Sequence, residues 1–242
     1  MRIALDHTSE IGVRAGRLLL GEPDLKMLGI VRRDVKDRDT RLNRVDTITD
    51  FDAVVTDDPD SIILAEALDA GVSCVLWADA ADASINDSGT PVLAGSNLVS
   101  GIGRSLAERE AGIPDAPTQI LFAWTEPGKP IRSGEPVSFP EPVGARWGTR
   151  RGMTNRRLEV AAPVPDEWAG VVVRATTDTQ VRTFGIADLA THLEAIALAS
   201  GAVVAALGLV PVGIHGPEEF ANAYLAAALS IGLDIAEFTS AG

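Results

Sequence analysis

Short apolar segments alternate with helix-like segments over the first half of the chain, and this alternation limits the fold more than any other feature of the sequence. The apolar segments are apolar throughout, which is typical of strands that are buried on both faces. The predicted strands are Arg2–Leu5, Leu25–Val31, Phe51–Thr56, Val72–Trp77 and Thr90–Leu93. Helical spacing of apolar residues indicates helices at Ile11–Leu20 and Ser61–Ala70. Residues 1–112 are therefore predicted to form an α/β domain with a parallel sheet.

The second half has a different order, with strands first and helices last. The predicted strands are Gln119–Thr125, Val137–Phe139, Leu158–Val164, Gly170–Thr176 and Gln180–Ile186, and the predicted helices are Asp188–Leu207 and Glu218–Leu233. A link of three residues, Thr177 to Thr179, joins the last two strands and is typical of a hairpin. We expect an α+β domain at residues 113–242 built on an antiparallel sheet, whose last helices can pack back on the first domain.

Two segments of the first half resemble two-domain NAD(P)-binding Rossmann reductases. FDAVVTDDPDSIILAEALDAGVSCVLWADA (51–80) is similar to the segment between the third and fourth strands in the dihydrodipicolinate-reductase-like and glucose-fructose-oxidoreductase-like families. AGSNLVSGIGRSLAE (94–108) is similar to their segment in which an Asn-containing loop begins the interdomain helix. The resemblance covers roughly residues 1–110 and implies an NAD(P)-linked oxidoreductase. It also implies a second domain that binds substrate and forms a homodimer.

The turn after the first strand departs from the glycine pattern of these families. Aligning Gly12 with the last of their three glycines puts Asp6 at the first position and Ser9 at the middle one. Gly12 keeps the close packing of helix on sheet. The Asp6 carboxylate would compete with a phosphate for the N-terminus of the helix. We therefore expect that this turn binds a dinucleotide poorly.

Two arginines after the second strand favour NADP over NAD. Arg32 and Arg33 stand where NADP-using relatives hold the 2′-phosphate, and the first acid after the strand is Asp34. Alternatively, these arginines belong to a solvated loop in which basic and acidic residues alternate. The sequence leaves both interpretations open.

The loop after the third strand is acidic. It contains Thr56, at the position that would contact the cofactor, followed by Asp57, Asp58 and Asp60. Clustered carboxylates can share a proton or hold a cation. The interpretation that we favour is that Asp60 caps the helix that follows.

Arginines cluster in the second half of a chain whose formal net charge is −13. The segment RWGTRRGMTNRR (146–157) contains Arg146, Arg150 and Arg151, which we predict to bind an anionic substrate through bidentate contacts. Trp147 would stack on a planar group. Pairing of these arginines with acids across a subunit interface is the alternative.

Catalytic groups are few. The His-His pair and Lys of dihydrodipicolinate reductases have no counterpart, and neither has the Lys-Pro pair of the oxidoreductases. The remaining candidates are His215, in a glycine-rich loop, and Asn97. His192 is expected on a helix surface, whereas Tyr224 and Cys74 are expected in the core. No spacing typical of metal ligands is present.

Charge and cysteine content exclude several classes of protein. A net charge of −13 argues against general binding to nucleic acid or anionic lipid, and a single cysteine fits a reducing compartment. No apolar run reaches the ~18 residues that span a bilayer, so we expect a cytoplasmic protein. Two functions stay open. One is an NADP-linked reductase of a small anionic substrate, and the other is a non-catalytic homologue that has lost its cofactor and acts in ligand sensing or assembly.

Overall fold

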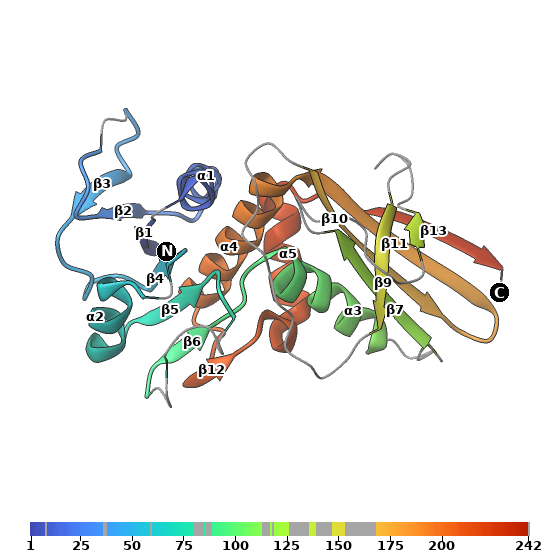
Figure 1. Ribbon diagram of the computed structural model, residues 1–242. Coiled ribbons are helices and arrows are strands. Elements are labelled where there is room, and N and C mark those ends of the chain that lie inside the picture. The colour runs from blue at the N-terminus through green and yellow to red at the C-terminus, as the bar shows by residue number, and fades with distance from the viewer. Residues whose placement is uncertain are drawn as a thin grey trace.

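The computed structural model contains two sheets, one in each half of the molecule (Figure 1). It describes residues 1–7, 9–35, 38–58, 60–79, 85, 89–112, 117, 119–125, 136–138, 147–152 and 168–241. For residues 125, 136–138 and 147–152, only the backbone is described.

The first sheet has seven strands, all parallel, in the order β12-β6-β5-β4-β1-β2-β3. The strands are β1 (Arg2–Asp6), β2 (Met27–Val31), β3 (Leu42–Val45), β4 (Ala53–Thr56), β5 (Ser73–Leu76), β6 (Pro91–Leu93) and β12 (Gly213–His215). The parallel α/β sheet predicted from the sequence is confirmed. Read from β3 to β6, the order is the 3-2-1-4-5-6 order of a Rossmann fold.

Two strands of this sheet differ from the prediction. No strand was predicted over the polar segment Leu42–Val45, but it forms the edge strand β3 beside β2. One edge and part of both faces of such a strand remain in water, so it needs few apolar residues. Strand β12 comes from the second half of the chain and pairs with β6, where a glycine-rich loop was predicted.

Helices from both halves cover the first sheet. Helix α1 (Glu10–Leu19) lies on one face together with α4 (Ala190–Ala206), and α2 (Ile62–Ala70) lies on the other. Nearly every residue of α4 is buried, because this helix packs between the first sheet and the second. An apolar surface all round is typical of a helix in such a position.

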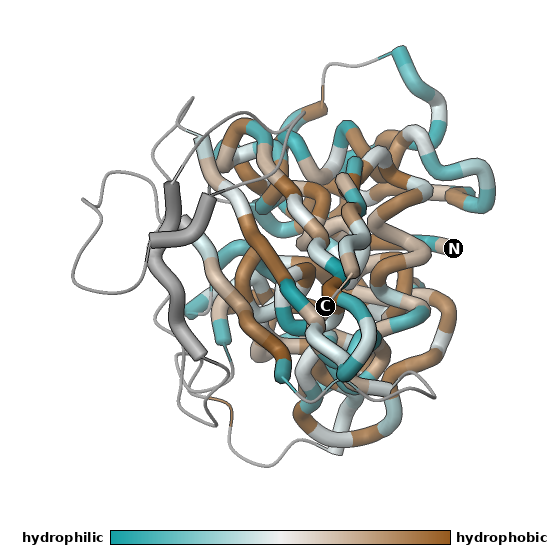
Figure 2. The backbone as a smooth tube through the Cα atoms, turned by 90° about the vertical axis from the view of Figure 1, so that its right-hand side faces the viewer, coloured by the Kyte–Doolittle hydropathy of each residue, from teal (hydrophilic) through white to brown (hydrophobic). Residues whose placement is uncertain are grey.

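The second sheet has the order β13-β11-β10-β7-β9-β8 and is antiparallel, which confirms the predicted second architecture. Its strands are β7 (Gln119–Thr125), β8 (Pro136–Ser138), β9 (Trp147–Gly152), β10 (Trp168–Thr176), β11 (Gln180–Leu189) and β13 (Ala236–Ala241). Figure 2, turned to view the molecule from the side of this sheet, shows hydrophobic stretches in its central strands. The predicted strand 158–164 lies outside the described residues.

The remaining helices join the two sheets. They are the π-helix η1 (Leu98–Gly103), α3 (Arg104–Ala111), the 3₁₀ helix η2 (Pro217–Phe220) and α5 (Ala221–Ile231). Helix α4 begins directly after β11, with Leu189 as its N-cap. None of the helices in the described ranges combines the length and apolar character needed to cross a membrane.

Candidate functional site

The carboxyl ends of β1 and β4 form the point where the strand order of the first sheet reverses. Asp6, the last residue of β1, lies beside Thr56, the last residue of β4. Ligands of open parallel sheets bind at such a switch point. The loops that leave these two strands carry the altered glycine turn and the acidic loop singled out in the sequence.

The N-terminus of α1 is occupied by a carboxylate from the neighbouring loop. Asp57 Oδ2 accepts hydrogen bonds from the Ser9 backbone N at 2.9 Å and from Ser9 Oγ at 2.6 Å. Ser9 is the N-cap of α1, and its Oγ accepts from the Ile11 backbone N at 3.2 Å. In a dinucleotide site, phosphate oxygens accept from the backbone N–H groups here. Asp57 therefore provides the negative charge that a pyrophosphate would otherwise bring.

Gly12 shows how closely this turn is packed. A Cβ atom at position 12 would overlap the side chain of His7 and would lie 2.8 Å from Asp57 Oδ2. Only glycine fits at position 12, as the sequence predicts. The groups that need this space are the side chains of His7 and Asp57 and not a bound phosphate. The space beside the first turn of α1 is filled by His7 and Asp57.

Asp6 has a different role from the one predicted. Its Oδ2 accepts a hydrogen bond from Ser61 Oγ, so the carboxylate points toward the start of α2. The competition with phosphate that was assigned to Asp6 belongs to Asp57. This follows from the distances across the switch point, since β1 and β4 are neighbours and their loops reach each other's helices.

The other residues of the acidic loop organise the chain locally. Thr56 Oγ1 accepts from the Asp58 backbone N at 3.0 Å, and Asp58 Oδ1 accepts from the Asp60 backbone N at 3.0 Å. The N-cap of α2 is Ser61, whose Oγ accepts from the Ile63 backbone N, and not Asp60 as predicted. Across the described residues, no three potential ligands form a metal-binding group.

The two arginines after β2 have separate surroundings. Arg32 has a positive φ of 53° and forms an ion pair with Glu66 at 2.7 Å, which turns its guanidinium toward α2. Arg33 Nη1 lies 3.5 Å from His7 Nδ1. Burial, with the Arg33 charge as a second cause, lowers the pKa of His7, so its imidazole is neutral beside the turn. Of the two, Arg33 has the environment suited to an anion.

A buried carboxyl group that the sequence analysis missed lies at the carboxyl end of β5. Glu194 of α4 is 5% exposed, and its Oε2 accepts from Trp77 Nε1 at 2.8 Å and from the Leu98 backbone N at 2.9 Å. Burial raises the pKa of Glu194 to about 7. A perturbed carboxyl at this edge of a sheet marks a candidate functional group. A single acid inside a long apolar run was the available signal.

Asn97, a predicted catalytic candidate, holds the same loop together. Its Nδ2 donates to the Trp77 carbonyl at 3.0 Å and its Oδ1 accepts from the Ser100 backbone N at 2.8 Å. Asn97 is 1% exposed. With both ends of its amide engaged, it fixes the start of the π-helix η1, and π-helical turns are frequent at functional sites.

His215 lies away from the switch point. It ends β12, at the edge of the sheet, with β6, β5 and β4 between it and β1. Its Nδ1 lies 2.9 Å from Glu219 Oε2, and this hydrogen bond raises the pKa of His215. The structure therefore does not bring His215 together with the residues around Asp57.

The predicted anion-binding arginines are in the second sheet. Arg150 and Arg151 belong to β9 and pair with Ala123 and Phe122 of β7, whereas Arg146 lies outside the described residues. Tyr224 and Cys74 are buried, as predicted, and His192 is partly exposed at 3.9 Å from Asp188.

Comparison with known proteins finds similar solved structures but no match by sequence. Neither the family models nor the curated proteins match the chain. Among solved structures, the chain is similar to a dipicolinate-bound dihydrodipicolinate reductase from Paenisporosarcina sp. TG-14, at 10% identity and a TM-score of 0.48. The alignment covers 91% of this chain and 98% of that one. At this identity the likeness concerns the fold.

The residues at the switch point do not fit the pyrophosphate of a dinucleotide. A pyrophosphate needs free N–H groups at the start of α1 and room beside Gly12. Asp57 already accepts from the Ser9 backbone N, and its oxygen stands 2.8 Å from where a Cβ of residue 12 would be. Two like charges at one helix N-terminus repel each other.

Proposed function

We propose that this protein is a non-catalytic relative of two-domain Rossmann reductases that has lost dinucleotide binding and acts in ligand sensing or assembly. The observation that carries the proposal is the Asp57 carboxylate at the N-terminus of α1, bound by the backbone N and the hydroxyl of Ser9. A carboxylate held there provides the charge that stabilises the helix dipole.

Three further features support the proposal. Gly12 leaves no space beside the turn, because His7 and Asp57 fill it. Arg32, predicted to bind a 2′-phosphate, is paired with Glu66. The sequence also lacks the catalytic His-His pair and Lys of the reductases that it resembles.

Titration with NADPH and NADH tests the proposal. Isothermal titration calorimetry of the full chain should give no saturable binding of either nucleotide up to about 1 mM, a concentration that detects binding free energies more favourable than about −4 kcal/mol. A thermal-shift assay over the same range should leave the melting temperature unchanged. Binding with a micromolar dissociation constant would contradict the proposal.

An NADP-linked reductase of a small anionic substrate is the second candidate. Arg33 favours it, because its guanidinium follows β2 and lies beside the neutral His7, with no ion pair to any of the described residues. Glu194, with a pKa of about 7, favours it as a group that can hold a proton near neutral pH. This function requires that Asp57 leave the N-terminus of α1. Oxidation of NADPH by the wild-type protein in the presence of an oxo acid would support it over the first proposal.

The assembly in solution belongs to the same proposal. We infer a homodimer through the second domain, as the resemblance implies, with Arg150 and Arg151 of β9 as groups that would bind either an anionic ligand or acids of a second copy. Because the chain has a net charge of −13, an anionic partner would be repelled from most of its surface. We therefore expect such a partner to bind only where basic residues gather, as Arg150 and Arg151 do in β9.

A further inference from the structure

A pocket of about 260 Å³ lies between α1 and strands β1, β2 and β3. The sheet contributes Leu5, Leu28 and Ile30 to its lining, and α1 contributes Val13 and its C-cap residue Leu20. The three sheet residues are buried. The pocket therefore has an apolar wall on both sides.

The pocket exists because the connection from β2 to β3 is short. A connection between neighbouring parallel strands usually contains a helix, which packs on the sheet beside the preceding helix. Here residues 32–41 make the connection, and those that the structure describes, 32–35 and 38–41, form no helix. The face of β2 and β3 next to α1 is consequently left without a helical cover.

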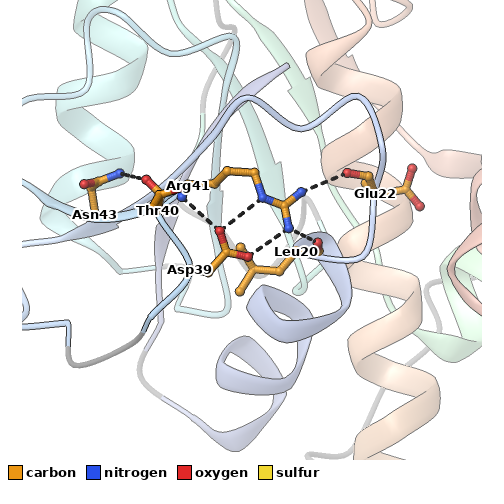
Figure 3. Close-up of polar contacts among 6 residues, drawn as sticks. All are labelled: Leu20, Glu22, Asp39, Thr40, Arg41 and Asn43. Atoms are coloured by element: carbon orange, nitrogen blue, oxygen red, sulfur yellow. Dashed lines mark hydrogen bonds and ion pairs between the residues drawn. The ribbon is translucent and has the colours of Figure 1, made fainter.

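The Arg41 side chain joins the β2–β3 connection to Leu20, which lines this pocket at the end of α1 (Figure 3). Arg41 Nη2 donates to the Leu20 carbonyl at 2.6 Å and to Asp39 Oδ2 at 2.8 Å, and Nε donates to Asp39 Oδ1 at 3.1 Å. These bonds fasten the β2–β3 connection to the C-terminal end of α1. Because Leu20 lines the pocket, they also fix the position of one wall.

The polar residues of the lining give the pocket a positive character. They are His7, Arg17, Arg33 and Asp34. The Asp34 carboxylate forms an ion pair with Arg44 at 2.8 Å, so its charge is compensated. Within the part of the chain that the structure describes, neither Arg17 nor Arg33 forms an ion pair. Two cations that have no ion pair among the described residues, beside an apolar wall, are unusual in a chain with a net charge of −13.

We propose that this pocket binds a small amphipathic organic acid. Its hydrophobic body would lie against Leu5, Leu28 and Ile30, and its acid group would accept hydrogen bonds from Arg33 and Arg17. Small-molecule sites combine an apolar lining with a few polar groups in this way, and their volumes begin at about 300 Å³. The ligand is therefore smaller than most cofactors. The proposal goes beyond the proposed function, because it requires no change at the N-terminus of α1.

Fluorescence titration with anilinonaphthalene sulfonate, itself an apolar body with one acid group, tests the proposal on the full chain. The wild-type protein should enhance the fluorescence saturably with one site per chain, and decanoate should displace the probe at least tenfold better than the uncharged decanol. Arg33→Ala and Val13→Trp should each weaken binding of the probe at least tenfold. Val13 is 36% exposed on α1, so the larger side chain fills the pocket without entering the core.

Matched variants separate a site from general attraction to the probe. Arg14→Ala removes a cation from the same helix, and Arg38→Ala removes one from the same connection, yet neither residue lines the pocket. Both should bind the probe within twofold of the wild type. If Val13→Trp does not fold, Val35→Trp fills the pocket from the opposite side. Equal binding by wild type, Arg33→Ala and the filled variant would overturn the proposal. Displacement of the probe by NADPH but not by decanoate would overturn it as well, and would at the same time count against the proposed function.

Discussion

Glu194 is a carboxyl group whose proton affinity depends on folding. In the unfolded chain its pKa is close to the ordinary value of 4.5, whereas burial between the two sheets raises it to about 7. Between these two values the native state binds the proton more strongly than the unfolded state does. The two hydrogen bonds to Oε2, from Trp77 and Leu98, hold the group in place in either protonation state.

Replacement of Glu194 by Gln should therefore remove part of the pH dependence of stability. The contribution of Glu194 to the free energy of unfolding should fall as the pH rises from about 4.5 to about 7, by about 3 kcal/mol at most. Relative to the wild type, Glu194→Gln should thus be more stable at about pH 8 than at about pH 5. Urea denaturation at the two pH values measures the difference. An equal effect of the substitution at both values would show that Glu194 is not protonated in the folded protein.

Cys74 should be chemically inert in the native protein. It is 1% exposed in β5, and burial raises its pKa to about 12, so almost no thiolate is present near neutral pH. Reaction with a thiol reagent such as dithionitrobenzoate should be at least about a hundredfold slower than in urea. Fast labelling of the folded chain would contradict the burial of this strand.

At the scale of elements, the first sheet was predictable because its strands are apolar throughout and its helices have clear ends. The edge strand β3 was missed, since its sequence LNRV is polar where water covers the edge. The residue at the N-terminus of α1 was also misassigned. From the sequence, either Asp6 or Asp57 could lie at this turn. Asp57 reaches Ser9 because β1 and β4 are neighbours in the sheet, which the sequence alone does not show. Glu194 was missed because its partners, Trp77 and Leu98, are distant in the chain.

The π-helix η1 packs against α5 so closely that Gly101 accepts no side chain. A Cβ at this position would overlap the hydroxyl of Tyr224, which is fully buried and donates to the Ala197 carbonyl at 2.7 Å. Gly101→Ala should destabilise the protein by about 1–3 kcal/mol through overpacking. In the Tyr224→Phe background the same substitution should cost less, because the overlapping oxygen is gone. Equal costs in both backgrounds, measured by chemical denaturation, would rule out this contact as the cause.

At the scale of the whole molecule, α4 makes the two sheets interdependent. It belongs to the second half of the chain and covers one face of the first sheet, and β12 extends that sheet by a further strand. We expected that the last helices can pack back on the first domain, but the pairing of β12 with β6 was not predicted. Contacts between residues so far apart in sequence depend on tertiary packing, which local patterns do not encode.

The homodimer expected from the resemblance is a prediction about the whole molecule. Sedimentation velocity at about 10 μM should give a single species of twice the chain mass, because a dimer interface of ordinary size supports association at this concentration. Sedimentation as a monomer at this concentration would contradict a role in assembly. Ligand sensing would then be the part of the proposed function that still stands.

We infer that the Asp57 carboxylate takes the place of a phosphate at the N-terminus of α1. Titration of Asp57→Ala with NADPH tests this inference most directly. Asp58→Ala is the matched control, because the Asp58 carboxylate accepts from the Asp60 backbone N of its own loop. Removing the charge frees the backbone N–H and the hydroxyl of Ser9 and opens space beside Gly12, so Asp57→Ala should bind NADPH at least tenfold more tightly than the wild type. Asp58→Ala should behave like the wild type. Tight binding by the unmodified chain, or no gain in Asp57→Ala with its fold intact, would contradict the account.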